Sequence, residues 1–251
     1  MQLTLVRNAT LQLDVAAGTV LVDPMLNPRD AVPAVEDTAP AVRNPLVDLP
    51  CSAESLAGAA DAVLVTHLHN DHFDDAARRL LSRAVSIFCQ PTDAERLRAD
   101  GFAQVSAVDD LAEVLPGLTA RRVPARHTLD VHVEALGQGS GYVLTGAGPI
   151  TYVAGDCVFS PELVQALDDH RPDVVVLNGG AARFLTGPPI SMTAEDIILA
   201  ARHAPDAHMV VVHLEALNHC PMTREELRRH LRAAGLSDRV SVPEDGQRLL
   251  L

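Results

Sequence analysis

Residues 61–72 read DAVLVTHLHNDH, a short apolar run followed at once by a polar segment with three histidines. The apolar run is bounded by polar residues, which predicts a buried strand. In extended backbone, residues two apart point to the same side, so His67 and His69 can bind one metal ion together. The turn that follows can bring Asp71 and His72 toward a second ion beside the first. Since metal-ligand clusters of this density rarely arise otherwise, the segment predicts a metal site rather than a solvated loop.

One segment cannot fill two four-coordinate sites, so further ligands must come from distant parts of the chain. Three candidates each follow a strand-like stretch: His127 in RRVPARHT, Asp156 in ITYVAGD and His213 in HMVVVH. Gly155 allows a tight turn directly before Asp156. Because sites on α/β scaffolds gather at the ends of strands, we expect these residues to meet the histidine-rich segment. Taken singly, each also fits a plainer interpretation: a surface histidine, a turn aspartate or a core histidine.

The segment THLHNDH carries the HxHxDH signature and resembles the metallo-β-lactamase superfamily. Asp23 before a proline, Asp156 after a glycine and the late His213 fall in the order of that family, over nearly the whole chain. More narrowly, DPML, VPARHT, AGD, LNGG and VVVH resemble the branch of ascorbate-6-phosphate lactonase-like hydrolases. The resemblance implies an α/β fold, a four-layer αββα sandwich with metal ions at one edge, and a single domain over residues 1–251.

The resemblance also implies a role for each ligand. One ion would be held by His67, His69 and His127, the second by Asp71, His72 and His213, and Asp156 would bridge the two. His69 stands where flavodiiron reductases usually carry glutamate, and the chain has no flavin domain, which favours zinc-type hydrolysis over di-iron redox chemistry. No cysteine occupies the late ligand positions, unlike in the lactamase branch whose site includes one. We expect two divalent ions, Zn²⁺ before Mn²⁺ or Fe²⁺, because N/O sites bind several divalent ions.

Two such ions share a water molecule and lower its pKa from about 15.7 toward neutrality, which makes hydroxide available at pH 7. This bridging hydroxide is expected to attack a small ester, lactone, amide or phosphoester. Asp71 and His213 are assigned to catalysis, and Asp71 is expected to hold the proton of the hydroxide and pass it to the leaving group. Two alternatives stay open: a phosphodiesterase or nuclease of the same superfamily, and a metal-binding regulatory protein without turnover. The second is disfavoured because all of the expected ligands are present.

Six further residues lie next to these positions and are candidates for orienting a ligand or contacting substrate. They are Asp23, Arg126, Asn178, Arg183, Glu215 and His219. Asp23 can accept a hydrogen bond from a metal-binding histidine, and the two arginines are the candidates for binding an anionic group. Each of the six also fits a structural role, as a turn residue or a solvated side chain. The remaining histidines are interpreted as surface or structural: His132, His170, His203, His208 and His230.

The composition excludes several classes of protein. The chain has 20 basic residues, all of them arginine, against 33 acidic ones, so its net charge is -13. Without lysine there is neither a Schiff-base lysine nor a phosphate-binding loop with its lysine. An acidic chain with only 3% aromatic residues is a poor match for nucleic acid or an anionic membrane surface, which also disfavours the nuclease. The expected partner is a small-molecule substrate, and a homo-oligomer stays open.

The cysteines and the N-terminus indicate the compartment. The four cysteines are far apart and form no CxxC pair, which fits neither a disulfide framework nor a cysteine-based zinc site. The first residues, MQLTLVRNATLQLDV, alternate polar and apolar and predict a strand rather than a signal peptide. There is also no apolar run long enough for a membrane span. A cytoplasmic location is therefore expected.

Periodicity predicts strands and helices along the whole chain. Residues 24–52 are rich in proline and lack periodicity, which predicts a long loop that shapes a pocket together with residues 179–192. Helices are expected at 74–83, 161–170 and 193–203 and after two T-x-x-E capping boxes, at 92–95 and 223–226. Buried strands at 61–66, 85–89, 173–178 and 208–213 lie between the helices. Sheet layers between helix layers are the simplest architecture for this order.

Overall fold

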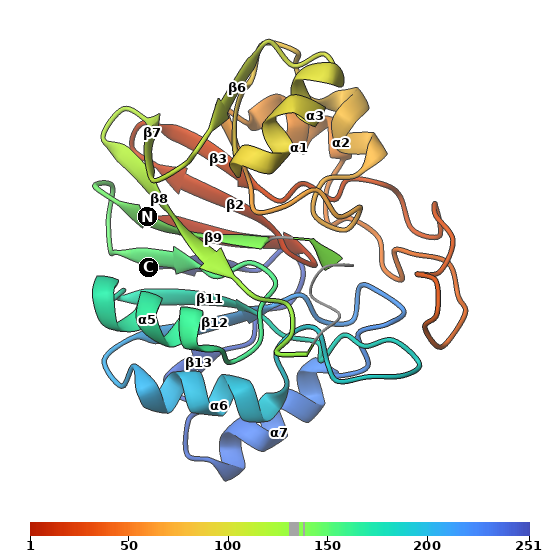
Figure 1. Ribbon diagram of the computed structural model, residues 1–251, viewed down its shortest axis with the longest axis vertical. Coiled ribbons are helices and arrows are strands. Elements are labelled where there is room, and N and C mark those ends of the chain that lie inside the picture. Colours follow the sequence, from red (N-terminus) through yellow and green to blue (C-terminus); the bar gives the residue numbers. More distant parts are fainter. Residues whose placement is uncertain (131–135, 138) are drawn as a thin grey trace.

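The computed structural model describes residues 1–130, 136–137 and 139–251, and His132 lies outside the described residues (Figure 1). Two seven-stranded sheets form the centre of the molecule. The strand order is β14-β1-β2-β3-β4-β5-β6 in the first sheet and β13-β12-β11-β10-β9-β8-β7 in the second. In each sheet one part is antiparallel and the other parallel, with the change of direction at β3 and β10.

The strands of the first sheet come from both ends of the chain. They are β1 Gln2–Arg7, β2 Thr10–Val15, β3 Gly18–Val22, β4 Ala62–Val65, β5 Ser86–Cys89, β6 Gln104–Ala107 and β14 Arg248–Leu250. The strands of the second sheet are β7 Leu111–Leu115, β8 Leu118–Ala125, β9 Gly139–Thr145, β10 Thr151–Val153, β11 Val174–Asn178, β12 His208–Val212 and β13 Val240–Ser241.

Helices cover the outer face of each sheet, which gives the four layers αββα (Figure 1). On the first sheet lie α1 Ala53–Ala59, α2 Asp75–Leu80 and α3 Ala94–Ala99, the last preceded by the 3-10 turn η1 Pro91–Asp93. On the second lie α5 Pro161–His170, α6 Ala194–His203 and α7 Arg224–Ala233. The predicted α/β sandwich is confirmed.

Apolar side chains fill the three spaces between these layers. Between the sheets, Leu5 and Leu13 of β1 and β2 pack in one cluster with Val210 of β12. Leu163 and Leu227 belong to the cluster under α5–α7, and a third cluster lies under α1–α3. Strands buried on both faces need apolar residues at every position, which is why DAVLVT and DVVVLN do not alternate.

Several local expectations differ from the structure. The capping box at residues 92–95 is wrong, because Pro91 begins a 3-10 turn and the N-cap residue of α3, Asp93, makes no side-chain cap bond. The second box is confirmed in part: Thr223 accepts a hydrogen bond from the Glu226 N–H. The sequence reasoning also missed α1 and β7. Residues 24–52 form a loop as predicted, with one isolated bridge between Val32 and Asn44.

The ends of five strands meet at one edge of the sandwich. Each of these strands is followed within three residues by a polar side chain. Asp23 follows β3, Thr66 and His67 follow β4, His127 follows β8, Asp156 follows β10 and His213 follows β12. Adjacent parallel strands bring their carboxyl ends to the same edge, so residues far apart in sequence become neighbours here. In the described part of the chain, no helix combines the length and the apolar character that crossing a membrane requires.

Candidate metal centre

Seven side chains meet at this edge in two groups whose potential ligand atoms lie within 4.8 Å of one another. The first group is His67, His69, His127 and Asp156, and the second is Asp71, His72, Asp156 and His213. The division matches the one that the family resemblance implies, with Asp156 common to both groups. Since these residues come from four separate segments, only the folded chain brings them together.

The carboxylate of Asp156 faces both groups, one oxygen to each. Its Oδ2 lies 4.0 Å from Nε2 of His67 and 3.8 Å from Nε2 of His127. Its Oδ1 lies 3.3 Å from Nε2 of His72 and 3.7 Å from Nε2 of His213. Asp71 completes the second group, with Oδ2 3.1 Å from Nε2 of His213 and 3.6 Å from Nε2 of His72. A carboxylate in this position could contact a ligand of either group through a different oxygen.

Most of the seven side chains have a second partner behind them. Nδ1 of His72 lies 2.8 Å from Oδ2 of Asp23, which also accepts a hydrogen bond from the Thr66 hydroxyl, while Oδ1 of Asp23 accepts one from the Thr66 N–H. Nδ1 of His213 lies 3.6 Å from Sγ of Cys220, and Asn178 donates to Oδ1 of Asp156 at 2.7 Å.

Nδ1 of His67 lies 3.1 Å from the Thr66 hydroxyl oxygen, and Nε2 of His69 lies 3.0 Å from the Leu136 carbonyl oxygen. Outer partners of this kind fix the ring orientation of metal-binding histidines and raise their basicity.

The ring nitrogens that face the centre fit divalent metal ions. Nε2 of His72 and both ring nitrogens of His127 are buried and have no hydrogen-bond partner among the described residues. A buried polar atom without a partner is costly and rare, so the Nε2 atoms of His72 and His127, which both face Asp156, are candidates to bind a metal ion. Imidazole nitrogen together with carboxylate oxygen is a donor set that suits zinc, manganese or iron.

The histidines differ in the direction in which their surroundings shift the pKa. Burial lowers the pKa of His67, and it lowers the pKa of His127 to about 4, so both rings are neutral and able to ligate at pH 7. Burial would also lower the pKa of His72 and His213, but the carboxylates of Asp156 and Asp71 outweigh it and raise both pKa values. A metal ion at the second group must therefore displace protons.

At two positions next to these side chains, a residue larger than glycine would make close contacts. Gly155 has φ +66°, and a Cβ there would lie 2.6 Å from the carbonyl oxygen of Ser140, so only glycine allows the turn that places Asp156. At Gly139 a Cβ would lie 3.2 Å from Cε1 of His127. His213 itself adopts φ +64°, an uncommon conformation for a residue other than glycine.

A cavity of about 590 Å³ opens above the seven side chains, and His69, Asp71, His127 and Asp156 form part of its wall. The predicted loop 24–52 contributes apolar residues such as Val32 and Pro45, and residues 179–192 contribute Phe184 and Ile190. The expectation that these two segments shape the pocket is confirmed.

The loop is held in place by Asn218. Its Oδ1 accepts from Nδ2 of Asn44 at 2.7 Å and from the Val35 N–H at 3.2 Å. Its Nδ2 donates to Oγ1 of Thr38 at 2.7 Å and to the Pro40 carbonyl oxygen at 2.8 Å. The buried amide of Asn218 therefore attaches the loop to the segment that follows His213.

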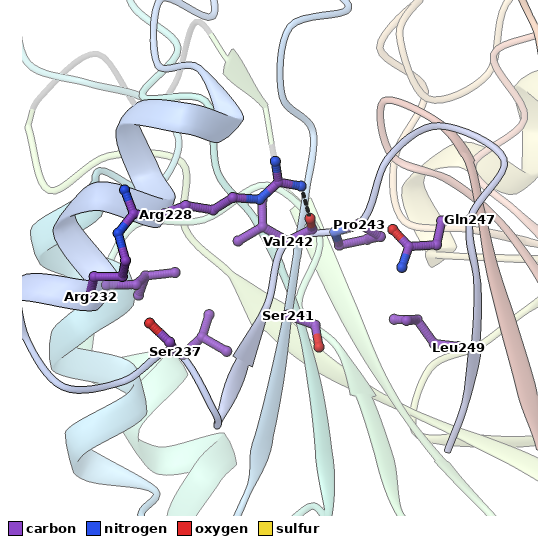
Figure 2. A pocket seen from close by; sticks show the side chains of 10 residues that line it. Arg228, Arg232, Ser237, Ser241, Val242, Pro243, Gln247 and Leu249 are labelled. Carbon is purple, nitrogen blue, oxygen red and sulfur yellow. Dashed lines mark hydrogen bonds between the residues drawn. The ribbon is translucent and has the colours of Figure 1, made fainter.

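A second cavity, of about 370 Å³, lies between α7 and the strands β13 and β14 (Figure 2). Figure 2 shows Arg228 donating to the Val242 carbonyl oxygen, at 2.6 Å, while Arg232, Ser237 and Ser241 lie around the hollow. The two groups of potential metal ligands found among the described residues both lie at the first cavity. The first cavity is therefore the candidate site.

The six residues predicted to orient a ligand or to contact substrate fall into two sets. Asp23 and Asn178 contact His72 and Asp156 as described, and His219 lines the cavity. The other three have their side chains elsewhere: Arg126 pairs with Glu162, Arg183 donates to the Ala181 carbonyl oxygen, and Glu215 pairs with Arg224.

Neither Arg126 nor Arg183 is among the described residues that line the cavity, so the structure adds no support to an anion-binding role, which stays a prediction. The carboxylate of Glu215 is paired with Arg224. Sequence reasoning missed Thr66 and Cys220, although Thr66 stands directly before the first histidine.

The comparisons with known proteins agree with this geometry. The family model described as beta-lactamase superfamily domain matches residues 19–214. The UPF0173 protein YddR of Bacillus subtilis is 34% identical over 98% of both chains. A UPF0173 metal-dependent hydrolase of Methanopyrus kandleri is 26% identical over 98% of both.

Among solved structures, the isothiocyanate hydrolase from Delia radicum gut bacteria is 35% identical, with a TM-score of 0.95 and coverage of 100% of this chain and 99% of that one. The family model covers more than half of this chain, and the two relatives named above each match 98% of it. The chain therefore belongs to the metallo-β-lactamase superfamily and is a metal-dependent hydrolase.

Proposed function

We propose that this protein uses two divalent metal ions, zinc in the first instance, to hydrolyse a small uncharged electrophile with an apolar substituent. The observation that carries the proposal is the position of Asp156, whose two oxygens face two separate groups of ligands. A single-ion site would need only one of these groups. A regulatory protein without turnover would be free to lose some of these metal ligands, whereas every expected ligand is present in both groups.

When bound, the pair of ions supplies a water molecule activated as a nucleophile and a Lewis acid for the attacked group. Asp71 is the residue placed to move the proton. Its side chain is partly exposed and lines the cavity, and its Oδ2 lies 3.1 Å from Nε2 of His213. In our proposal Asp71 accepts the proton of the nucleophile and passes it to the leaving atom, while His213 would hold the second ion beside this carboxylate.

The cavity wall favours an uncharged substrate. Among the described residues that line it there is no arginine, the whole chain has no lysine, and Glu36, Asp74 and Asp75 are acidic. An anionic substrate would therefore find no cationic side chain on the described wall, and only the metal ions could compensate its charge. Met25, Leu68 and other apolar side chains offer contacts to a hydrocarbon substituent.

An isothiocyanate is the first substrate to test, since a relative 35% identical is named for that hydrolysis. Water adds to the central carbon of R–N=C=S to give a thiocarbamic acid, which releases carbonyl sulfide and the amine R–NH2. Esters and lactones are uncharged electrophiles of the same size, and the lactonase-like branch stays a prediction. A phosphodiester is less well supported, because neither of the two arginines expected to bind it is among the described residues that line the cavity.

The test is a panel of four substrates assayed with protein loaded with Zn²⁺, Mn²⁺ or Fe²⁺. The panel consists of 2-phenylethyl isothiocyanate, a 4-nitrophenyl ester, a γ-lactone and bis(4-nitrophenyl) phosphate. We expect metal-dependent turnover of an uncharged substrate and none, or far less, of the phosphodiester. The chelated protein and the Asp156→Ala variant are the controls. A phosphodiester as the best substrate, or turnover that survives chelation, contradicts the proposal. Cytoplasmic location remains a sequence prediction, and the oligomeric state stays open.

A further inference from the structure

One histidine of the cavity wall belongs to neither group of metal ligands. His219 lies in the segment that follows His213, is only 8% exposed, and lines the same cavity as Asp71 and Asp156. Its main chain is fixed on both sides: its carbonyl oxygen accepts from the Arg183 N–H at 3.0 Å, and its neighbour Asn218 holds the loop. The backbone of His219 is therefore held at the cavity wall.

We propose that the Nε2–H of His219 donates a hydrogen bond to the heteroatom of the substrate that is bonded to the attacked carbon. This inference rests on the proposed function and adds to it a residue that contacts the substrate. For an isothiocyanate the accepting atom is nitrogen or sulfur, and for an ester or lactone it is an oxygen. A substrate without an acceptor at that position would lose this contact.

The two ring nitrogens of His219 are in different surroundings. Nδ1 is enclosed by protein and has no hydrogen-bond partner among the described residues. Nε2 is not enclosed in this way, and because His219 lines the cavity, we infer that Nε2 is the ring nitrogen exposed to it. An enclosed N–H donor without an acceptor is rarer in proteins than an enclosed acceptor without a donor. The proton of the neutral ring is therefore expected on Nε2, where it can be donated.

The surroundings also keep the ring uncharged. Burial is the main cause that lowers the pKa of His219, and the neighbouring Asp71 only partly opposes it. A neutral imidazole suits a cavity that binds an uncharged substrate, since it adds a directional donor without adding charge. Because His219 lines the same cavity as Asp71 and Asp156 without belonging to either group of ligands, it offers the substrate a polar contact besides the metal ions.

Two variants separate hydrogen bonding from packing. His219→Gln keeps an N–H donor on a side chain of similar reach, whereas His219→Phe keeps a flat ring and removes the donor. His203→Gln is the matched control, because His203 pairs with Asp168 away from the cavity. Metal content and melting temperature are measured for all variants, so that a loss of folding is recognised.

The readout that does not depend on turnover is the tautomer of His219. Nitrogen-15 correlation spectra of the zinc-loaded protein report which ring nitrogen carries the proton, and the signals missing in His219→Gln assign the residue. The second reagent is 2-phenylethyl azide, a linear analogue of the isothiocyanate that water does not hydrolyse. We expect the Nε2–H tautomer, and a shift of its signal when the azide binds.

In the activity assay, we expect His219→Phe to lose about tenfold or more in kcat/KM with unchanged metal content, and His219→Gln to stay within about threefold of the parent. An Nδ1–H tautomer, no response to the azide, or full activity of His219→Phe would each overturn the inference. If no substrate of the panel is turned over, the proposed function fails, but the tautomer and the azide response still decide the role of His219.

Discussion

Replacing Asp23 by asparagine should weaken the second ion while leaving the first in place. Asp23 is buried, its Oδ2 lies 2.8 Å from Nδ1 of His72, and its Oδ1 accepts the Thr66 N–H at 2.8 Å. The carboxylate therefore fixes the proton of His72 on Nδ1. The other nitrogen, Nε2, is then free to ligate and faces Asp71 and Asp156.

In Asp23→Asn the amide oxygen can still accept the Thr66 N–H, which places the amide NH2 against Nδ1 of His72. Nδ1 must then accept, the proton moves to Nε2, and the lone pair needed by the metal is lost. If the amide turns over instead, its NH2 group faces the Thr66 N–H, and two donors then meet without an acceptor. Loss of a partner of this kind costs about 10–100-fold in metal affinity, or about 1.4–2.7 kcal/mol.

The assay is a competition titration with a chromogenic chelator, which reports the two binding steps separately. We expect one affinity to fall by about 10–100-fold and the other, for the group with His67, to change by less than about threefold. Asp14→Asn makes the same chemical change at a carboxylate on β2 outside the site and serves as the control. Two affinities equal to those of the parent in Asp23→Asn would refute this role for Asp23.

Three further perturbations have defined outcomes. Asp71→Asn should reduce kcat by about 10²–10⁴-fold while the protein still binds metal, measured by turnover and metal analysis; an unchanged kcat would exclude a proton-transfer role. Asn218→Ala should raise KM about tenfold, with a smaller change in kcat and faster proteolysis of residues 28–47, because it frees the loop; equal cleavage rates would contradict this. Lowering the pH from 8 to 6 should weaken one ion by about tenfold per pH unit for each proton displaced, because His72 and His213 have raised pKa values and must lose protons to ligate; a pH-independent affinity would be inconsistent with this.

The sequence allowed the ligands to be predicted because their spacing is local or their position in the fold is regular. Two-residue alternation placed His67 and His69 on one side, and the rule that sites gather at strand ends selected His127 and His213. The division into two groups came from the family resemblance, and the arrangement of the seven side chains agrees with it.

The parts that could not be predicted depend on partners far away in sequence. Nothing near Arg126 indicates that Glu162 will hold it, and nothing near Glu215 indicates the pairing with Arg224. The role of Asn218 is invisible for the same reason, since its partners are more than 170 residues away. Elsewhere a local rule lost to a stronger one, as where Pro91 began a 3-10 turn in place of the expected capping box.

Whether two ions lie on either side of Asp156 can be measured by anomalous diffraction at the metal absorption edges, on crystals of the protein with its natural metals. We predict two peaks about 3.5–4 Å apart, one beside His67, His69 and His127 and the other beside Asp71, His72 and His213. A single peak, or metal bound only at other residues, would contradict the proposed two-metal hydrolase.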